Sequence, residues 1–189
     1  MGSRLPTDPG VDALITRAKT GDQAAFDSLF ESYRRAVYRY LVYRVDDSPS
    51  AEDLTAEVFL RVAQALPTYR QQGVPFQAWI LRIARNLAID HYRKTSAGQL
   101  VPLDERLTSV EDDLDLTVDR QLTSERLRAA LAGLTDEQRE VIILRFVVGC
   151  PIAEVVAALS KSESAVKALQ SRGLAALRET LIESKVSYD

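Results

Sequence analysis

The sequence holds very few of the residues that build disulfides, metal centres or redox sites. Its 189 residues include one cysteine, one histidine and one tryptophan. A single cysteine, Cys150, excludes a disulfide within the chain and fits a reducing compartment such as the cytosol. His91 has no histidine or cysteine at metal-binding spacing, and no glycine-rich phosphate loop is present. We therefore expect no metal, no cofactor and no catalytic residues, and so no enzyme.

Long hydrophobic runs are also missing. No stretch approaches the roughly 18 apolar residues of a membrane-spanning helix, and the first residues contain no apolar signal core. We expect a cytoplasmic protein that does not insert into a membrane by itself. A hydrophobic content of 46% is nevertheless sufficient for a globular core.

The chain lacks a strong charge excess, with a formal net charge of −3. This figure hides an uneven distribution: residues 1–95 carry +2, residues 96–119 carry −6 and residues 120–189 carry +1. The middle segment has no sustained helical or strand period. The sequence therefore predicts two mildly basic bodies joined by a flexible acidic linker.

Helical periodicity dominates the first body, and no convincing strand pattern occurs in either body. We expect helices at residues 12–19, from Asp22 to about residue 44, from Ser50 to about residue 66, and at residues 76–94. Asp22 is placed to cap the second helix, and Ser50 and Asp53 resemble a capping box for the third. Residues 68–75 form a loop rich in polar and aromatic side chains. The fold class is predicted as all-α.

In the second body, a short helix containing Leu127 and Leu131 precedes a capping box formed by Thr135 and Gln138. The helix that this box opens is expected to end at Gly149. Two further helices, at residues 152–159 and 163–181, follow and are joined by a polar turn in which Ser162 can act as a cap.

The last helix has two contrasting faces. Val166, Leu169, Gly173 and Leu177 share one face, whereas the other carries small side chains flanked by lysine and arginine. A helix of this kind can enter a DNA groove while its cations reach phosphates and base edges, as in a helix-turn-helix. A helical hairpin with a solvated outer face fits the spacing equally well.

Several strings together resemble the bacterial sigma-70 family of RNA polymerase sigma factors, in particular the extracytoplasmic-function (ECF) type. In the first body the matching strings are residues 21–26, 37–40, 51–61 and 78–93. In the second body they are residues 134–141, 144–146 and 165–167. Pro151, Ser164 with Ala165, and Gly173 depart from the residues that the family usually has at these places.

The resemblance implies a factor that binds core RNA polymerase, directs it to promoters and helps to melt the DNA. It implies a region 2-like domain at residues 10–95, a linker at 96–119 and a region 4-like helix-turn-helix domain at 120–183. The polymerase-binding residues implied in the first domain are Asp53, Leu54, Glu57, Val58 and Arg61. Without the resemblance, the charged residues among these would be read as a solvated helix face.

The resemblance also implies two DNA-binding surfaces. The residues expected to read the melted −10 element are Tyr69, Arg70, Gln71, Gln72, Phe76, Arg82, Arg85, Asn86 and Arg93. The residues expected to read the −35 element as duplex are Arg145, Ser164, Lys167, Ala168, Ser171, Arg172 and Arg178. An exposed aromatic ring can stack on an unpaired base, and amides and guanidinium groups can bind its edges and phosphates.

The partners expected from the resemblance are core RNA polymerase, promoter DNA and an anti-sigma factor. On the polymerase, the expected contacts are the clamp helices of the largest subunit and the flap region of the second-largest subunit. The acidic linker, with its cluster at Glu111, Asp112 and Asp113, is either a plain spacer or a polyanion that occupies a basic channel. The alternatives are a stand-alone helix-turn-helix regulator and, less favoured, a module that sequesters other proteins.

Overall fold

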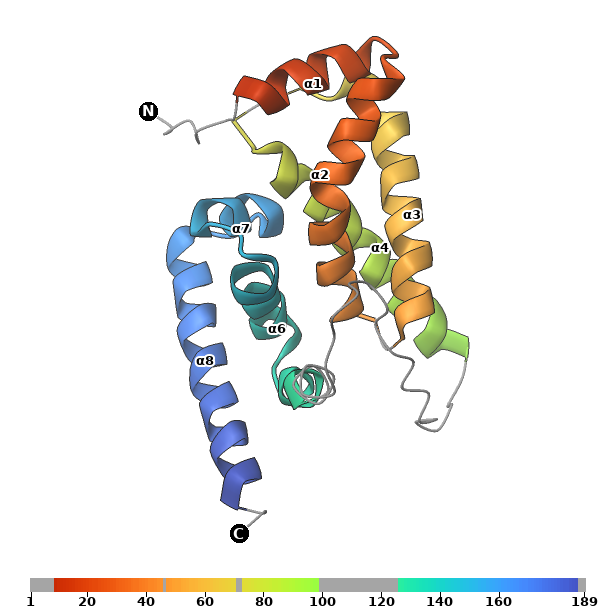
Figure 1. The fold of residues 1–189 in the computed structure, drawn as a ribbon. Coiled ribbons are helices and arrows are strands. Elements are labelled where there is room, and N and C mark those ends of the chain that lie inside the picture. Colours follow the sequence, from red (N-terminus) through yellow and green to blue (C-terminus); the bar gives the residue numbers. More distant parts are fainter. Residues whose placement is uncertain (1–8, 46, 71–72, 99–125, 187–189) are drawn as a thin grey trace. The chain divides into compact units, whose positions relative to one another are not determined.

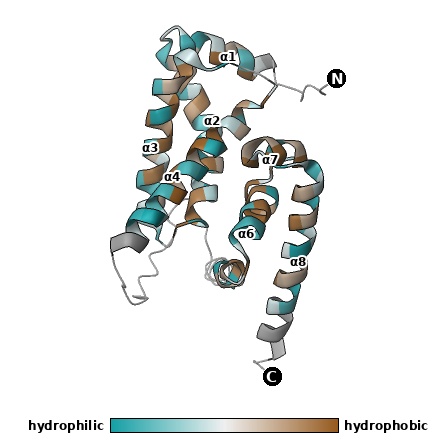
Figure 2. Cartoon of the chain, turned by 180° about the vertical axis from the view of Figure 1, so that it is seen from behind, coloured by the Kyte–Doolittle hydropathy of each residue, from teal (hydrophilic) through white to brown (hydrophobic). Residues whose placement is uncertain are grey.

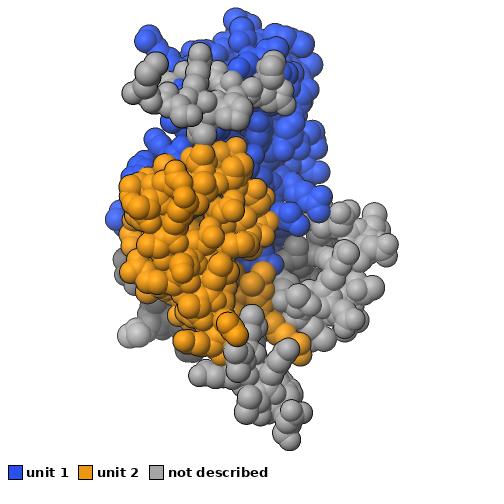
Figure 3. Space-filling view, turned by 90° about the vertical axis from the view of Figure 1, so that its left-hand side faces the viewer, with its two compact units in different colours: residues 1–107, 157–160 blue, residues 108–156, 161–189 orange. Residues whose placement is uncertain are grey.

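The computed structural model describes residues 9–45, 47–70, 73–98 and 126–186. Within these ranges the chain forms α-helices, one short 3-10 helix and one π-helical segment, and no strand, which confirms the all-α prediction. The chain divides into two compact units, residues 1–107 with 157–160 and residues 108–156 with 161–189 (Figure 3). In the described ranges no helix is long and apolar enough to cross a membrane.

Some sequence predictions fall outside this description. Gln71 and Gln72 of the loop are among them, as is the predicted linker from residue 99 onward with its cluster at Glu111, Asp112 and Asp113. The predicted domain limits at residues 10–95, 96–119 and 120–183 therefore remain a proposal.

The N-terminal unit is a bundle of four helices (Figure 1). They are α1 (Pro9–Lys19), α2 (Gln23–Val42), α3 (Ser48–Ala65) and α4 (Phe76–Gly98), with the short 3-10 helix η1 (Leu66–Thr68) after α3. α2 packs against the other three helices, and α1 also contacts η1. The helices carry hydrophilic and hydrophobic residues on different faces (Figure 2), as expected for helices that surround a common core.

Aspartate side chains fix the starts of two of these helices. Asp22 Oδ1 accepts a hydrogen bond from the Ala25 backbone N–H at 3.1 Å, as predicted. The predicted start of α3 at Ser50 is wrong, because the helix already begins at Ser48. Asp47 is its cap and accepts from the Ser50 N–H at 2.7 Å, and a proline in the first turn needs no hydrogen bond there.

The core of the N-terminal unit lies where α2, α3 and α4 meet. Tyr40, Leu41, Val58 and Ile80 are at most 1% exposed, and each contributes roughly 1.5–3 kcal/mol by leaving water. The rings of Phe30 on α2 and Phe59 on α3 meet edge to face, with centroids 4.7 Å apart. Residues far apart in the chain thus hold the three long helices together.

In the C-terminal unit, residues 126–132 are helical and are followed by α6 (Asp136–Ile142), the π-helical segment η2 (Ile143–Val148), α7 (Ile152–Leu159) and α8 (Glu163–Val186). The last residues of α7, from 157 onward, are grouped with the first unit. α8 packs along α6. The predicted capping box is confirmed. Thr135 Oγ1 accepts from the Gln138 N–H at 3.4 Å, and Gln138 Oε1 accepts from the Thr135 N–H at 3.2 Å.

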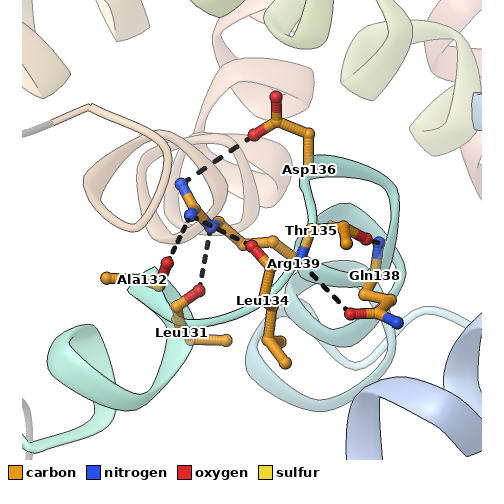
Figure 4. A network of polar contacts seen from close by, with 7 residues as sticks. All are labelled: Leu131, Ala132, Leu134, Thr135, Asp136, Gln138 and Arg139. Carbon is orange, nitrogen blue, oxygen red and sulfur yellow. Dashed lines mark hydrogen bonds and ion pairs between the residues drawn. The ribbon is translucent and has the colours of Figure 1, made fainter. Parts of the chain in front are cut away.

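Arg139 joins the helix at residues 126–132 to α6 (Figure 4). Its guanidinium donates to the carbonyl oxygens of Leu131 at 2.9 Å, Ala132 at 3.1 Å and Leu134 at 3.4 Å. Asp136 lies 4.0 Å from the same group. One cation therefore satisfies carbonyl groups that the end of a helix leaves without intrahelical donors.

Gly149 ends η2 in the left-handed region, with φ of 89°, as the sequence predicts. Leu144 O accepts from the Gly149 N–H and, at 2.8 Å, from the Cys150 N–H. The bond from Gly149 to Leu144 spans five residues, so the segment is wider than an α-helix, and this change of helix type was not predicted.

Candidate nucleic-acid interface

α7, a tight turn and α8 form the predicted pair of helices. Ser160 in the turn has a positive φ of 54°, and the Lys161 N–H returns to Val156 O at 3.3 Å, which closes the end of α7. Ser162 Oγ accepts from the Ala165 N–H at 3.2 Å and so caps α8, as predicted. Lys161 Nζ lies 2.5 Å from Glu137 Oε1, which anchors the turn to α6.

α8 presents the two faces that the sequence indicates. Val166 is 0% and Leu169 7% exposed, and Gly173 is also buried. The exposed side chains of the opposite face are Ser164, Lys167, Ala168, Ser171, Arg172 and Arg178. Lys167 Nζ lies 2.5 Å from Glu163 Oε1, but such exposed pairs contribute only about 0–1 kcal/mol, so a phosphate can replace the carboxylate.

Arg145 lies apart from this face. Its side chain is half-buried, Nε donates to Gln170 Oε1 at 3.2 Å, and Nη1 donates to the Cys150 carbonyl oxygen. These bonds join the end of η2 to α8. Next to it, Phe146 is 53% exposed, and the centroid of its ring lies 5.8 Å from Cζ of the Arg145 guanidinium. Sequence reasoning missed this exposed ring because it stands in an apolar run.

The five predicted polymerase-binding residues on α3 differ in how far they are exposed. Asp53 and Arg61 are exposed, Leu54 and Glu57 are half-buried, and Glu57 Oε1 pairs with Arg61 Nε at 2.9 Å. Val58 is 0% exposed and packs in the core, so its side chain does not reach the surface. Leu60, which the sequence prediction did not include, is 53% exposed and lies between Glu57 and Arg61 in the sequence.

Tyr69 and Phe76, at either end of the predicted −10 loop, are buried, with exposures of 7% and 3%. The Tyr69 ring lies 4.5 Å from the Trp79 ring and 5.4 Å from the Phe76 ring, and Tyr33 adds a further edge contact to Phe76 at 5.5 Å. The structure therefore places these two rings in an aromatic cluster under the loop.

Tyr69 makes polar contacts through both its side-chain hydroxyl group and its backbone carbonyl group. Its hydroxyl group donates to Val74 O at 3.4 Å, and its carbonyl oxygen accepts from Lys19 Nζ at 2.6 Å. Burial raises the pKa of the Tyr69 hydroxyl, and the negative charge of Asp12 raises it further. The hydroxyl group therefore stays protonated and remains a donor at neutral pH.

The other predicted −10 residues lie on the surface to different degrees. Arg70 in the loop is exposed, as are Asn86 and Arg93 on α4, whereas Arg82 and Arg85 are half-buried. Tyr92, which the sequence prediction left out, is 66% exposed on α4. α4 thus carries amide, guanidinium and aromatic groups that can bind a melted strand.

Among the residues that the structure describes, no group of three or more His, Cys, Asp or Glu side chains is placed to hold a metal ion. Cys150 is 1% exposed, and His91 lies at the boundary of the surface, half-buried.

Two families match the chain, in two separate ranges of residues. Residues 29–97 match Sigma-70 region 2, and residues 124–177 match Sigma-70, region 4.

Curated relatives are similar over most of the chain. ECF RNA polymerase sigma factor SigX of Bacillus subtilis is 37% identical over 163 residues, which are 83% of this chain and 84% of SigX. SigD of Mycobacterium tuberculosis is 32% identical over 179 residues, 91% of this chain and 84% of SigD. BldN of Streptomyces coelicolor is 37% identical over 174 residues, which are 89% of this chain but only 64% of BldN.

Solved structures share the fold. CnrH in complex with the cytosolic domain of CnrY is 25% identical and matches with a TM-score of 0.74, over 92% of this chain and 98% of CnrH. The sigma factor RpoE of Bartonella quintana, in complex with the anti-sigma factor NepR, is 22% identical, with a TM-score of 0.65 over 82% of this chain and 96% of RpoE. The second likeness concerns the fold alone.

Proposed function

Because the chain belongs to the ECF type of sigma-70 family sigma factors, we propose that its two units bind core RNA polymerase together and each read one promoter element. The observation that carries this proposal is the exposed face of α8. There, Lys167, Arg172 and Arg178 stand among small side chains on a helix that follows a capped turn. The chain acts in transcription initiation, and the polymerase supplies the chemistry, so we propose no active site in this chain.

In the C-terminal unit, α8 reads the −35 element as duplex DNA. Ser164, Ala168 and Ser171 leave room for the helix in the major groove, and the three cations reach phosphates or base edges. A bidentate contact to a base contributes about 1–3 kcal/mol of discrimination, whereas a phosphate contact strengthens binding to all sequences alike. Arg145 acts through α8, since it holds this helix by its bond to Gln170.

In the N-terminal unit, the loop after Tyr69 and the outer side of α4 bind the melted −10 element. Arg70 of the loop and the α4 residues contact the strand, while the buried rings of Tyr69 and Phe76 hold the loop in place. The α4 residues assigned to the strand are Arg82, Arg85, Asn86 and Arg93. Gln71 and Gln72 stay part of this proposal as groups that bind base edges.

α3 binds the clamp helices of the largest polymerase subunit, and the C-terminal unit binds the flap region of the second-largest subunit. Asp53, Glu57 and Arg61 supply charge on α3, and Leu54 and Leu60 supply apolar area. An apolar side chain inside a polar rim is typical of the centre of a protein interface. Val58 supports this surface from within the core.

An anti-sigma factor is the regulatory partner that we propose. The CnrH and RpoE structures are complexes with CnrY and with the anti-sigma factor NepR, and both share the fold of this chain. Because core polymerase is the target, the protein would act in the cytoplasm.

Reconstituted transcription with core polymerase on a genomic library tests the proposal. We expect transcripts that start downstream of a shared pair of sequence elements, and only when both the chain and core polymerase are present. Tight, sequence-specific DNA binding by the chain alone, with no transcripts, would instead support a stand-alone helix-turn-helix regulator.

A further inference from the structure

A contact between α1 and the end of η1 lies outside everything assigned above. Lys19, the last residue of α1, donates from Nζ to the carbonyl oxygen of Tyr69 at 2.6 Å, although 50 residues separate the two in the chain. α1 also precedes residue 29, where the region 2 match begins. Neither the family match nor the sequence prediction therefore gives Lys19 a role.

The position of Lys19 is itself fixed by the turn that follows it. Gly21 adopts a positive φ of 91°, and the Asp22 N–H returns to Arg17 O at 3.2 Å. The Asp22 carboxylate accepts from Arg17 Nε at 2.8 Å and from the Ala25 N–H at 3.1 Å. Lys19 thus lies between two anchored residues, so its ammonium group reaches Tyr69 from a rigid base.

Tyr69 is the residue from which the proposed −10 loop departs. Its ring is held by Trp79 and Phe76, its hydroxyl group by Val74 O, and its carbonyl group by Lys19. The carbonyl contact acts directly on the peptide unit that leads into Arg70. A hydrogen bond from an ammonium group is stronger than one between neutral groups, and a partly buried carbonyl that loses its donor is costly.

We propose that Lys19 is a positioning residue for reading of the −10 element, a role that rests on the proposed function. The Lys19–Tyr69 bond sets the direction in which the chain leaves the aromatic cluster, and hence where Arg70 meets the melted strand. α1 is then part of the promoter-reading machinery through the contact of Lys19 with Tyr69.

Fluorescence of the free chain tests the bond. Trp79 is the single tryptophan, and its ring packs on Tyr69, so its emission reports on the start of the loop. We expect Lys19→Met to shift the emission to longer wavelength and to increase acrylamide quenching, and Lys19→Arg to behave as the wild type. Arg34→Met removes one charge from an exposed site on α2, where Arg34 pairs with Glu31 at 3.0 Å, and it should leave both readouts unchanged.

The second experiment uses holoenzyme and a promoter recovered from the genomic library. We measure the ratio of transcription from that promoter to transcription from copies with one base changed in the −10 or in the −35 element. For Lys19→Met we expect roughly a tenfold loss of −10 discrimination, about the effect of one lost charge-assisted hydrogen bond, with −35 discrimination intact. Lys19→Arg should rescue it, and Arg34→Met should retain it.

Unchanged Trp79 fluorescence in Lys19→Met would overturn the inference. So would altered fluorescence with normal −10 discrimination, or equal losses at both elements that follow the loss of thermal stability, and in these cases the proposed function stands. A wild-type holoenzyme that does not distinguish −10 variants would overturn the proposed function itself, together with this role for Lys19.

Discussion

Gly173 on α8 lies so close to Ile142 on α6 that a Cβ atom on the glycine would stand 2.9 Å from Ile142 Cγ1 and 3.2 Å from Cδ1. Ile142 is only 2% exposed, so it has little room to move. Gly173 is one of the positions at which the sequence departs from the residues that the family usually has. In this chain, therefore, the absence of a side chain at Gly173 allows the two helices to approach at that point.

We expect Gly173→Ala to destabilise the C-terminal unit by about 1 kcal/mol. Overpacking costs roughly 1–3 kcal/mol, and the better helix propensity of alanine returns up to about 1 kcal/mol. Chemical denaturation measures the difference. In an Ile142→Ala background the clash is gone and the same substitution should become stabilising, so destabilisation of equal size in both backgrounds would contradict this explanation.

Ser160→Gly should stabilise the protein by roughly 0.5–1 kcal/mol, because serine pays a steric cost at its positive φ of 54° and glycine does not. Equilibrium unfolding in urea is the measurement. Gly149→Ala, at φ of 89°, is the matched control and should move stability in the opposite direction. A loss of stability in Ser160→Gly would show that the serine side chain contributes more than its backbone costs.

The cap of α2 should make stability depend on pH. The hydrogen bond from the Ala25 N–H, followed by that from Arg17, lowers the pKa of Asp22 below its ordinary value of 3.8. A carboxyl group with a lowered folded-state pKa stabilises the fold above its unfolded-state pKa, and this contribution disappears as pH falls through the folded-state value. Asp22→Asn keeps an acceptor but not the charge.

We therefore expect the wild type to exceed Asp22→Asn in melting temperature at about pH 7, and the gap to narrow towards about pH 3. Asp27→Asn, in which the exposed partner of Gln23 is changed, serves as the control of equal charge. A gap that stays constant over the whole range would mean that ionisation of Asp22 contributes nothing.

Substitutions of Lys167 and Glu163 that remove their charges should change the affinity for promoter DNA in opposite directions. Lys167→Met removes a phosphate contact, so the holoenzyme should bind promoter DNA more weakly, and the slope of log affinity against log salt should fall by about one. Glu163→Gln removes the carboxylate that lies 2.5 Å from Lys167 Nζ, and affinity should rise. Binding titrations at several salt concentrations decide this, and equal effects of both variants would contradict a DNA contact at Lys167.

Substitutions at Leu60 and Val58 should have different effects, the first on polymerase binding and the second on stability. Leu60→Asp places a charge on an exposed site, so we expect at least a tenfold loss of affinity for core polymerase with an unchanged melting temperature. Val58→Ala creates a cavity in the core and should cost about 2 kcal/mol of stability without a specific loss of affinity. Competition with an unlabelled sigma factor for core polymerase measures the first effect, and thermal unfolding measures the second.

The sequence predicted best those features that depend on neighbours along the chain. Thr135, Gln138, Ser162 and Gly149 act where they were expected, because caps and helix ends need only a few consecutive residues. The start of α3 was missed because Asp46, Asp47 and Ser50 all precede an apolar pattern, and sequence alone does not choose which of them accepts the first N–H.

Features that depend on tertiary contacts were not predictable. The ring of Tyr69 was expected to offer a stacking surface, but in the folded unit it is buried against Trp79 and Phe76. The exposure of Phe146 was not predicted either, and this residue lies in the π-helical segment Ile143–Val148, a change of helix type that the sequence did not indicate. Neither change is visible as periodicity.

Because Cys150 is buried, the reactivity of its thiol can report how often the C-terminal unit opens. The thiol is the only one in the chain and is 1% exposed, so a maleimide or disulfide reagent can reach it only in molecules that have transiently unfolded around η2. When reclosing is faster than alkylation, the labelling rate gives the free energy of that opening without denaturant. A ligand that binds and stabilises this unit, whether promoter, polymerase or inhibitor, would then lower the labelling rate of Cys150.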